Sequence, residues 1–108
     1  MNLIGRTCVA CEGGTPPFTL EEIKKYLPKL KTGWEVIDQK KLKQEFKFKT
    51  FAEAMKFVNE IAKIAETEGH HPDLYIYYNR VIVELSTHAV DGLSENDFIM
   101  AAKIEIIK

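Results

Sequence analysis

Cysteine is scarce in this chain, which has only Cys8 and Cys11 in 108 residues. Their C-x-x-C spacing fits a redox dithiol in a thioredoxin-like β-α-β context, or half of a zinc site that needs two further ligands. The nearby sequence offers neither the β-α-β pattern nor more ligands. We therefore expect a reduced surface pair in a mobile N-terminal tail. A zinc ion shared between subunits stays open as an alternative.

An excess of one charge is also missing, since 15 Lys and Arg residues face 16 Asp and Glu residues. This balance argues against nucleic acid or an anionic membrane as partner. No apolar run approaches the roughly 20 residues of a membrane span. Residues 1–15 lack the apolar centre of a secretory signal. We expect a soluble, cytoplasmic protein that does not bind membranes.

Three segments carry helix patterns. Capping boxes begin the first two, at Thr19 and Thr50, and Ser94 is expected to cap the third. Pro28 should end or bend the first helix, and Gly69 should stop the second, which is the longest. The stripe expected to face the core on the second helix comprises Phe51, Met55, Val58, Ala62 and Ala65, widened by Ala54 and Ile61.

Strand patterns occupy the segments between the helices. They span residues 34–37, 42–48, 74–78 and 81–86, and the last two should form a hairpin joined at Asn79-Arg80. The order α-β-β-α-β-β-α predicts an α+β two-layer fold, in which a four-stranded antiparallel sheet carries three helices on one face. Residues 1–17 are expected to be a flexible N-terminal tail, and residues 18–108 a single domain.

The histidines of the chain are His70, His71 and His88, all within residues 66–97. Glu66 lies four residues before His70, so its carboxylate can reach that ring if the helix persists. Asp97, in the first turn of the last helix, should be a stabilised anion able to orient a neighbouring ring. Imidazole suits proton transfer near neutral pH, so this segment is the candidate site.

Other interpretations of these residues have to be weighed. A single histidine near a helix end is usually a cap or a surface residue. His, Asp and Glu can also bind metal, but no H-x-x-x-H or H-E-x-x-H pattern exists, so no metal site is predicted. Pro72 disfavours helix at His71, so the rings of His70 and His71 should point in different directions.

The spacing of these residues resembles the signature of the pterin-4a-carbinolamine dehydratases. The matching pattern is Glu66-x3-His70-His71-Pro72-x5-Tyr78-x9-His88-x8-Asp97. Similarity extends over residues 18–106, including Gly33-Trp34 and Phe46-x-Phe48-x-x-Phe51. The chain departs from the family at Leu74, where an aromatic residue is common, and at Gly69, where an acidic one is frequent. Both departures concern a wall of the pterin pocket.

This resemblance implies an enzyme that dehydrates 4a-hydroxytetrahydropterin to quinonoid dihydropterin, recycling the cofactor of aromatic amino acid hydroxylases. It implies that His70 and His88 are the acid–base pair and that His71 binds substrate or assists. Glu66 and Asp97 would orient rings or hold pterin N–H groups, and Pro72 would shape the loop. We expect Tyr78 in the core rather than in the pocket wall. Neither a metal nor another cofactor is implied.

Two further functions remain open by the same resemblance. Animal members also act as dimerisation cofactors of a homeodomain transcription factor, which is a non-catalytic transcriptional role. A pterin-binding protein without turnover is the other possibility. The complete histidine set favours catalysis, because a scaffold has no chemical need for it. The sheet should leave two open edges, and a second subunit commonly covers one of them. The resemblance implies a homodimer or homotetramer.

Overall fold

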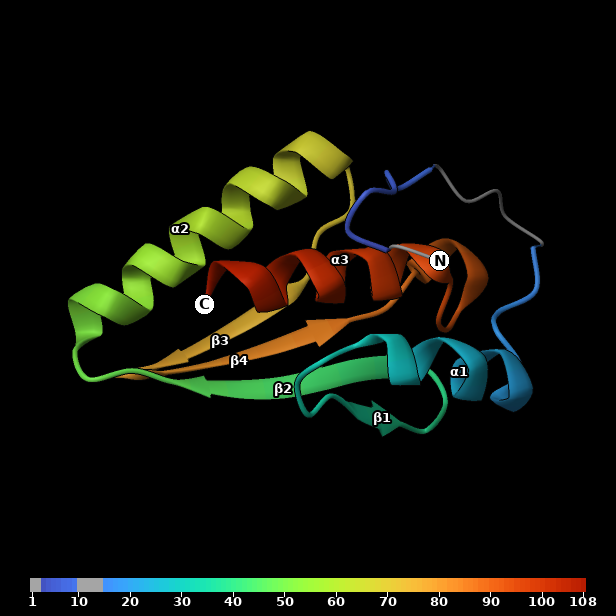
Figure 1. Cartoon of the computed structure of the whole chain (residues 1–108), viewed down its shortest axis with the longest axis horizontal. Helices are drawn as coiled ribbons and strands as arrows, with labels where there is room; N and C mark the ends of the chain where they lie inside the picture. Colours follow the sequence, from blue (N-terminus) through green and yellow to red (C-terminus); the bar gives the residue numbers. More distant parts are fainter. Residues whose placement is uncertain (1–2, 10–14) are drawn as a thin grey trace.

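The structure is a computed structural model that describes residues 3–9 and 15–108 (Figure 1). Its elements, in chain order, are α1 (Leu20–Tyr26), the 3-10 turn η1 (Leu27–Lys29), β1 (Glu35–Ile37), β2 (Lys41–Lys47), α2 (Phe51–Glu68), β3 (Asp73–Tyr77), β4 (Arg80–Leu85), the 3-10 turn η2 (His88–Val90) and α3 (Glu95–Ile107). The expected order of helices and strands is confirmed.

All strand pairs of the sheet are antiparallel, in the spatial order β1-β2-β4-β3. Asp38 and Gln39, in the turn between β1 and β2, both have positive φ, as a type I′ turn requires, and the Lys40 N–H donates to the Ile37 carbonyl at 2.9 Å. α2 and α3 lie over one face of the sheet (Figure 1). The predicted α+β two-layer class is confirmed, and β1 and β3 are its edge strands.

The limits of α2 follow from local chemistry that the sequence displays. The Thr50 hydroxyl accepts a hydrogen bond from the Glu53 N–H at 3.1 Å, which satisfies one of the unpaired donors of the first turn. Gly69 adopts a left-handed conformation with φ of 68° and ends the helix. Both predicted ends are therefore confirmed.

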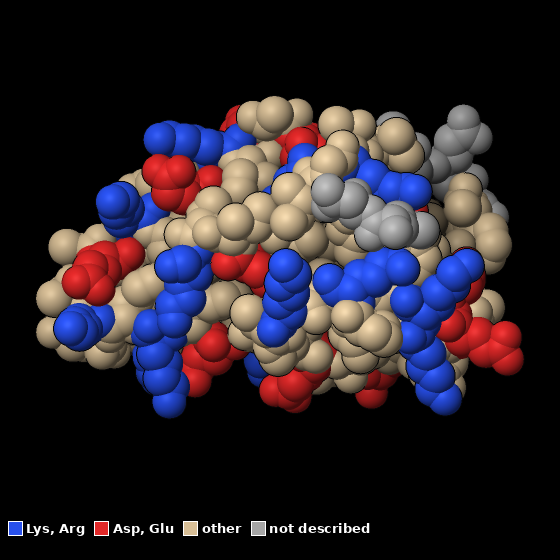
Figure 2. Space-filling view, in the orientation of Figure 1, with Lys and Arg blue, Asp and Glu red and all other residues tan. Residues whose placement is uncertain are grey.

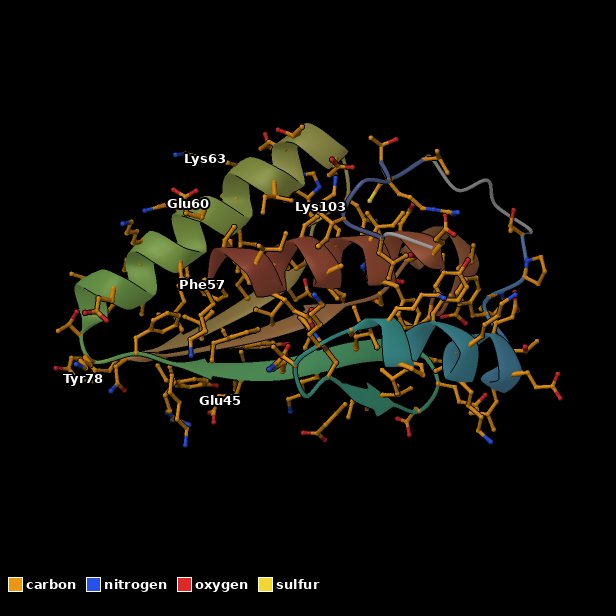
Figure 3. The ribbon with its side chains drawn as sticks, in the orientation of Figure 1. Glu45, Phe57, Glu60, Lys63, Tyr78 and Lys103 are labelled. Atoms are coloured by element: carbon orange, nitrogen blue, oxygen red, sulfur yellow. The ribbon has the colours of Figure 1, made fainter. Side chains whose placement is uncertain are left out.

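The buried face of α2 differs from the expected stripe. It consists of Ala54, Phe57, Ile61 and Ala65, whereas Phe51 is 50% exposed. Phe57 contacts the ring of Phe46 at 4.9 Å between centroids, and Figure 3 shows it pointing from the helix toward the sheet. Three of the four buried residues, Ala54, Ile61 and Ala65, belong to the expected stripe, and only Phe57 does not. The buried face is therefore rotated by about one residue, from Met55, Val58 and Ala62 toward Ala54, Phe57 and Ile61.

α3 is the central element of the core. Every residue from Asn96 to Ala102 is buried, as is Ile104. A helix that is apolar on nearly all sides must be surrounded by other elements. α3 accordingly contacts α2, β2 and β4. Its first turn carries Asn96 and Asp97, so these polar residues are enclosed at one end of the core.

Residues 3–9 contact the rest of the domain at several points. Leu3 is 3% exposed and belongs to the core cluster. The Cys8 N–H donates to Glu68 Oε1 at 2.8 Å, which ties the segment to the last turn of α2. Short-range sequence patterns do not show such long-range contacts. Cys11 lies outside the described residues.

The charged side chains of the visible face are interspersed, with Lys and Arg beside Asp and Glu (Figure 2). This arrangement agrees with the balanced composition and gives no broad patch of one sign on that face. Within the ranges 3–9 and 15–108, no helix is both long enough and hydrophobic enough to span a bilayer.

Candidate active site

The three histidines line one pocket at the end of the molecule where α2 stops, β4 stops and α3 begins. Its volume is about 280 Å³, near the lower end of the roughly 300–1,000 Å³ found for small-molecule sites. The lining residues are Val9, Gly69, His70, His71, Ser86, Thr87, His88, Ala89 and Asn96. Residues from both ends of the candidate segment therefore meet in space.

His70 is held by a buried carboxylate. Its Nε2 lies 2.6 Å from Asp97 Oδ1, and the side chains are 12% and 0% exposed. An ionised carboxylate can only accept, so the contact places a proton on Nε2. The other ring nitrogen, Nδ1, is then the one that can exchange a proton with a ligand. Asp97 thus fixes both the orientation and the tautomer of His70.

Asp97 is itself fully supported by hydrogen bonds. Its Oδ2 accepts from the Thr87 hydroxyl at 2.8 Å and from the Ser94 N–H at 3.0 Å. The Ser94 and Thr87 hydroxyl oxygens lie 2.7 Å apart. Because Thr87 gives its only proton to Asp97, Ser94 is the donor in that contact. A buried anion needs partners of this kind, and the helix N-terminus adds favourable electrostatics.

The predicted contact between Glu66 and His70 is wrong. Glu66 Oε2 instead lies 2.5 Å from His71 Nε2, with side chains 77% and 60% exposed. The left-handed Gly69 turns the chain out of the helix before His70, so spacing of four residues no longer brings side chains together. His70 is carried toward α3, and His71 folds back over the last turns of α2. The two rings have different partners, as the sequence suggested.

His88 opens the turn η2, lines the same pocket and is exposed. The turn is closed by a bridge in which the Thr87 N–H donates to the Gly92 carbonyl at 2.8 Å. A Cβ at Gly92 would lie 2.7 Å from Pro17 Cβ, so only glycine fits there. Gly92 therefore allows the end of this turn to pack closely against Pro17.

Tyr78 does not belong to the pocket or to the core. It is 70% exposed with φ of 52°, in the turn between β3 and β4. Figure 3 shows it at the tip of that hairpin, and the chain reaches the tip only after running the whole of β3 away from His70. The expectation of a core tyrosine is wrong because the turn lies at Tyr78 and Asn79 rather than at Asn79-Arg80. Pro72 lies just before β3, in the loop that carries His71.

Four residues that shape the site are not among the site residues predicted from the sequence. Ser94 had a usable signal, because it caps α3 with Asp97 at the third helical position. Thr87, Asn96 and Val9 had none, since each acts through contacts between residues distant in sequence.

A larger cavity of about 370 Å³ lies elsewhere, between Leu3, Lys31 and Ile106. Its only carboxylate, Glu105, already accepts hydrogen bonds from the Trp34 Nε1–H and from backbone N–H groups at Lys31 and Thr32. It contains no histidine, so the smaller pocket is the better candidate for acid–base chemistry. In the described part of the chain, no three His, Cys, Asp or Glu side chains are grouped to hold a metal ion.

Cys8 lies near the pocket but is a poor nucleophile. Burial, followed by the neighbouring charge of Glu68, raises its pKa to about 12. The thiol therefore stays protonated at neutral pH, and its sulfur lies 3.7 Å from the Asn96 carbonyl oxygen. Its position contrasts with the surface location expected from the sequence.

Comparisons with known proteins agree with the histidine constellation. The family model described as pterin 4 alpha carbinolamine dehydratase matches residues 16–107. A relative from Alkaliphilus metalliredigens, provisionally named pterin-4-alpha-carbinolamine dehydratase, is 47% identical over 96% of this chain and 94% of its own. One from Legionella pneumophila with the same provisional name is 50% identical over 96% and 93%.

A solved structure, described as a transcriptional coactivator/pterin dehydratase from Brucella melitensis, superposes with a TM-score of 0.79. It is 38% identical and covers 84% of this chain and 97% of its own. The matched region contains the described elements from α1 to α3 and all three histidines. This chain therefore belongs to the pterin-4-alpha-carbinolamine dehydratase family.

Proposed function

We propose that the protein dehydrates 4a-hydroxytetrahydropterin to quinonoid dihydropterin by general acid–base catalysis. The observation that carries this proposal is the convergence of His70, His71 and His88 on one pocket. Relatives with the family name extend over nearly the whole chain and support the same substrate class. The product would re-enter the tetrahydropterin cycle of aromatic amino acid hydroxylases.

The reaction requires only two proton movements. The C4a–O bond breaks, the hydroxyl takes up a proton and leaves as water, and N5 loses a proton as the C4a=N5 double bond forms. No electron is gained or lost overall. Two imidazoles that line the same pocket, one donating and one accepting a proton, supply both functions near neutral pH.

His70 is held in an orientation suited to one of the two proton transfers. Asp97 holds its Nε2 at 2.6 Å, which leaves Nδ1 to work on the substrate and stabilises positive charge if the ring gains a proton. The network behind Asp97 keeps that geometry fixed before substrate arrives. Preorganisation of this kind lowers the cost of reaching the transition state.

His88 would carry the other proton, and His71 would bind the substrate or assist. His88 is exposed, so it can exchange its proton with water between turnovers. His71 is paired with Glu66, whose carboxylate can also accept N–H groups of the pterin. Pro72 restricts the backbone between His71 and β3, and so shapes this wall.

The test is the rate of loss of 4a-hydroxypterin absorbance with His70→Ala and His88→Ala variants. Each substitution should lower the catalysed rate at least about tenfold, within the range for lost acid–base assistance. Circular dichroism should show both variants folded, because neither ring belongs to the core cluster. Wild-type turnover in both variants would refute the assignment.

Binding without turnover is distinguished by the same assay. A pterin-binding protein or a purely transcriptional cofactor would leave the absorbance decay at its uncatalysed rate, even if a dihydropterin bound. Catalysis by the wild-type chain at substoichiometric concentration would exclude both roles as its sole function.

We also propose that the protein is a homodimer or homotetramer. β3 is an edge strand whose Tyr75, Ile76 and Tyr77 are 43%, 40% and 50% exposed. Exposed edges with apolar side chains are commonly covered by a second subunit. Light scattering coupled to size-exclusion chromatography tests this, and a monomer at micromolar concentration would contradict it.

A further inference from the structure

Residues 3–9 reach the histidine pocket although they lie outside the part of the chain that the family model matches, residues 16–107. Leu3 anchors the segment in the core, and Val9 lines the pocket beside His70 and His88. The Val9 side chain belongs to a residue that is 69% exposed, so it is available to a ligand. The segment is thus positioned to form a wall of the site.

One side chain fixes the backbone of Val9. The Val9 N–H donates to Asn96 Oδ1 at 3.0 Å, and Asn96 Nδ2 donates to the Val9 carbonyl at 2.6 Å. Asn96 is 5% exposed and lies in the first turn of α3, next to Asp97. Because both polar groups of Val9 are bound by one buried amide, its position is set by the same helix turn that orients His70.

A second contact holds the preceding residue. The Cys8 N–H donates to Glu68 Oε1, and Glu68 Oε2 lies 2.7 Å from Lys103 Nζ on α3. These bonds join the segment to both helices that border the pocket. Most other lining side chains are polar, such as His70, Thr87 and Asn96, or small, such as Ala89. Val9 is the larger aliphatic side chain in this lining, so it offers an apolar surface on which a flat ring could pack.

We propose that Val9 is a specificity-determining residue whose side chain packs against the bound pterin, and that Asn96 is the positioning residue that holds it there. This inference rests on the proposed function for the identity of the ligand. Val9 would act on substrate binding rather than on proton transfer, because its side chain has no group that can exchange a proton.

The experiment compares Val9→Ala, Asn96→Ala and the double variant with wild type, using two 4a-hydroxytetrahydropterins that differ in the size of the substituent at C6. A missing methylene group in an apolar pocket changes kcat/KM by about 10- to 200-fold when fully enclosed. Since Val9 is partly exposed, KM should rise by about three- to tenfold in Val9→Ala, with kcat little changed. The ratio of KM values for the two substrates should also change.

Asn96→Ala should raise KM by at least the same factor, and the double variant should show no further increase, because both substitutions remove one contact. Ile4→Ala is the matched control: Ile4 is a 43% exposed apolar residue of the same segment that does not line the histidine pocket. It should leave KM and kcat unchanged. Thermal unfolding of every variant verifies folding.

An unchanged KM in Val9→Ala, with an active wild type, would overturn the inference. A fall in kcat at constant KM in Asn96→Ala, or KM increases that multiply in the double variant, would overturn the role of Asn96. If the wild type does not turn over, the proposed function fails, and fluorescence titration with 7,8-dihydrobiopterin decides instead. Weaker binding by Val9→Ala would then support the proposal that Val9 packs against the bound pterin, and equal binding would refute it.

Discussion

The contact between His70 and Asp97 predicts a specific effect of the substitution Asp97→Asn. The Oδ2 position receives two donors, the Thr87 hydroxyl and the Ser94 N–H, so the amide oxygen of asparagine must occupy it. The amide nitrogen then faces His70 Nε2 and donates to it. The neutral ring must then carry its proton on Nδ1. In wild type Nδ1 can accept a proton from the substrate, whereas in the variant it can only donate one.

The magnitude follows from the two functions that are lost. A wrong tautomer and the loss of the compensating charge remove acid–base catalysis by His70, so kcat should fall as it does in His70→Ala, by at least about tenfold and by up to about 10⁴-fold. The hydrogen bond between Asp97 and His70 also loses its charge, which should cost about 1.5–3 kcal/mol of unfolding free energy. A domain of this size, with about 5–15 kcal/mol in total, should still fold.

Stopped-flow absorbance of 4a-hydroxypterin decay measures kcat, and ¹⁵N NMR of the imidazole reports the tautomer of His70. Asp91→Asn is the control: its side chain is 89% exposed and forms only a 3.4 Å pair with Lys40 at the surface. It should behave as wild type. An Asp97→Asn variant with kcat within threefold of wild type, or with Nε2 still protonated, would refute the proposed orientation of His70.

Three other predictions concern the surroundings of the site. The hydrogen bond from Lys103, followed by that from the Cys8 N–H, lowers the pKa of Glu68. The ionised Glu68 side chain therefore stabilises the folded protein above about pH 4.3, the pKa of Glu in the unfolded chain, and this stabilisation is lost as the pH falls through the lower pKa of the folded state. Urea unfolding of Glu68→Gln should show a deficit of about 1–3 kcal/mol at pH 7 that shrinks in acid, and a pH-independent deficit would contradict this. In a Cys11→Ser chain, Cys8 should react with iodoacetamide at pH 8 at least about 100-fold more slowly when folded than in guanidinium, because its raised pKa keeps the thiol protonated; equal rates by mass spectrometry would disprove it. Gly92→Ala should lower Tm and the dehydration rate, since its Cβ would meet Pro17 at 2.7 Å, and a wild-type Tm would contradict the required close approach.

The features predicted correctly from sequence are those encoded by neighbouring residues. Thr50 and Gly69 limit α2 through interactions within a few positions, and alternation of polar and apolar residues identified β2. The order of elements then sufficed for the fold class. The three histidines were selected by residue type and spacing, and the structure brings them to one pocket.

The errors concern contacts that depend on where the chain turns. The sequence predicts a contact of Glu66 with His70, but the contact forms with His71, because the left-handed conformation of Gly69 changes the direction of the chain that follows the helix. Tyr78 was placed in the core because a tyrosine in a β-rich run gives no sign that it occupies the turn. The hydrogen bonds of Val9 with Asn96 join positions 87 residues apart, and no local pattern encodes them.

The burial of α3 on nearly all sides has a consequence for how this protein tolerates change. The helix that fills the interior also presents, at its first turn, the carboxylate on which His70 depends. A substitution deep in the interior that slides or rotates this rod by a fraction of an ångström would displace the carboxylate by a similar distance. Thermal stability and catalytic activity consequently depend on the same helix, so a substitution in α3 that changes one should also change the other.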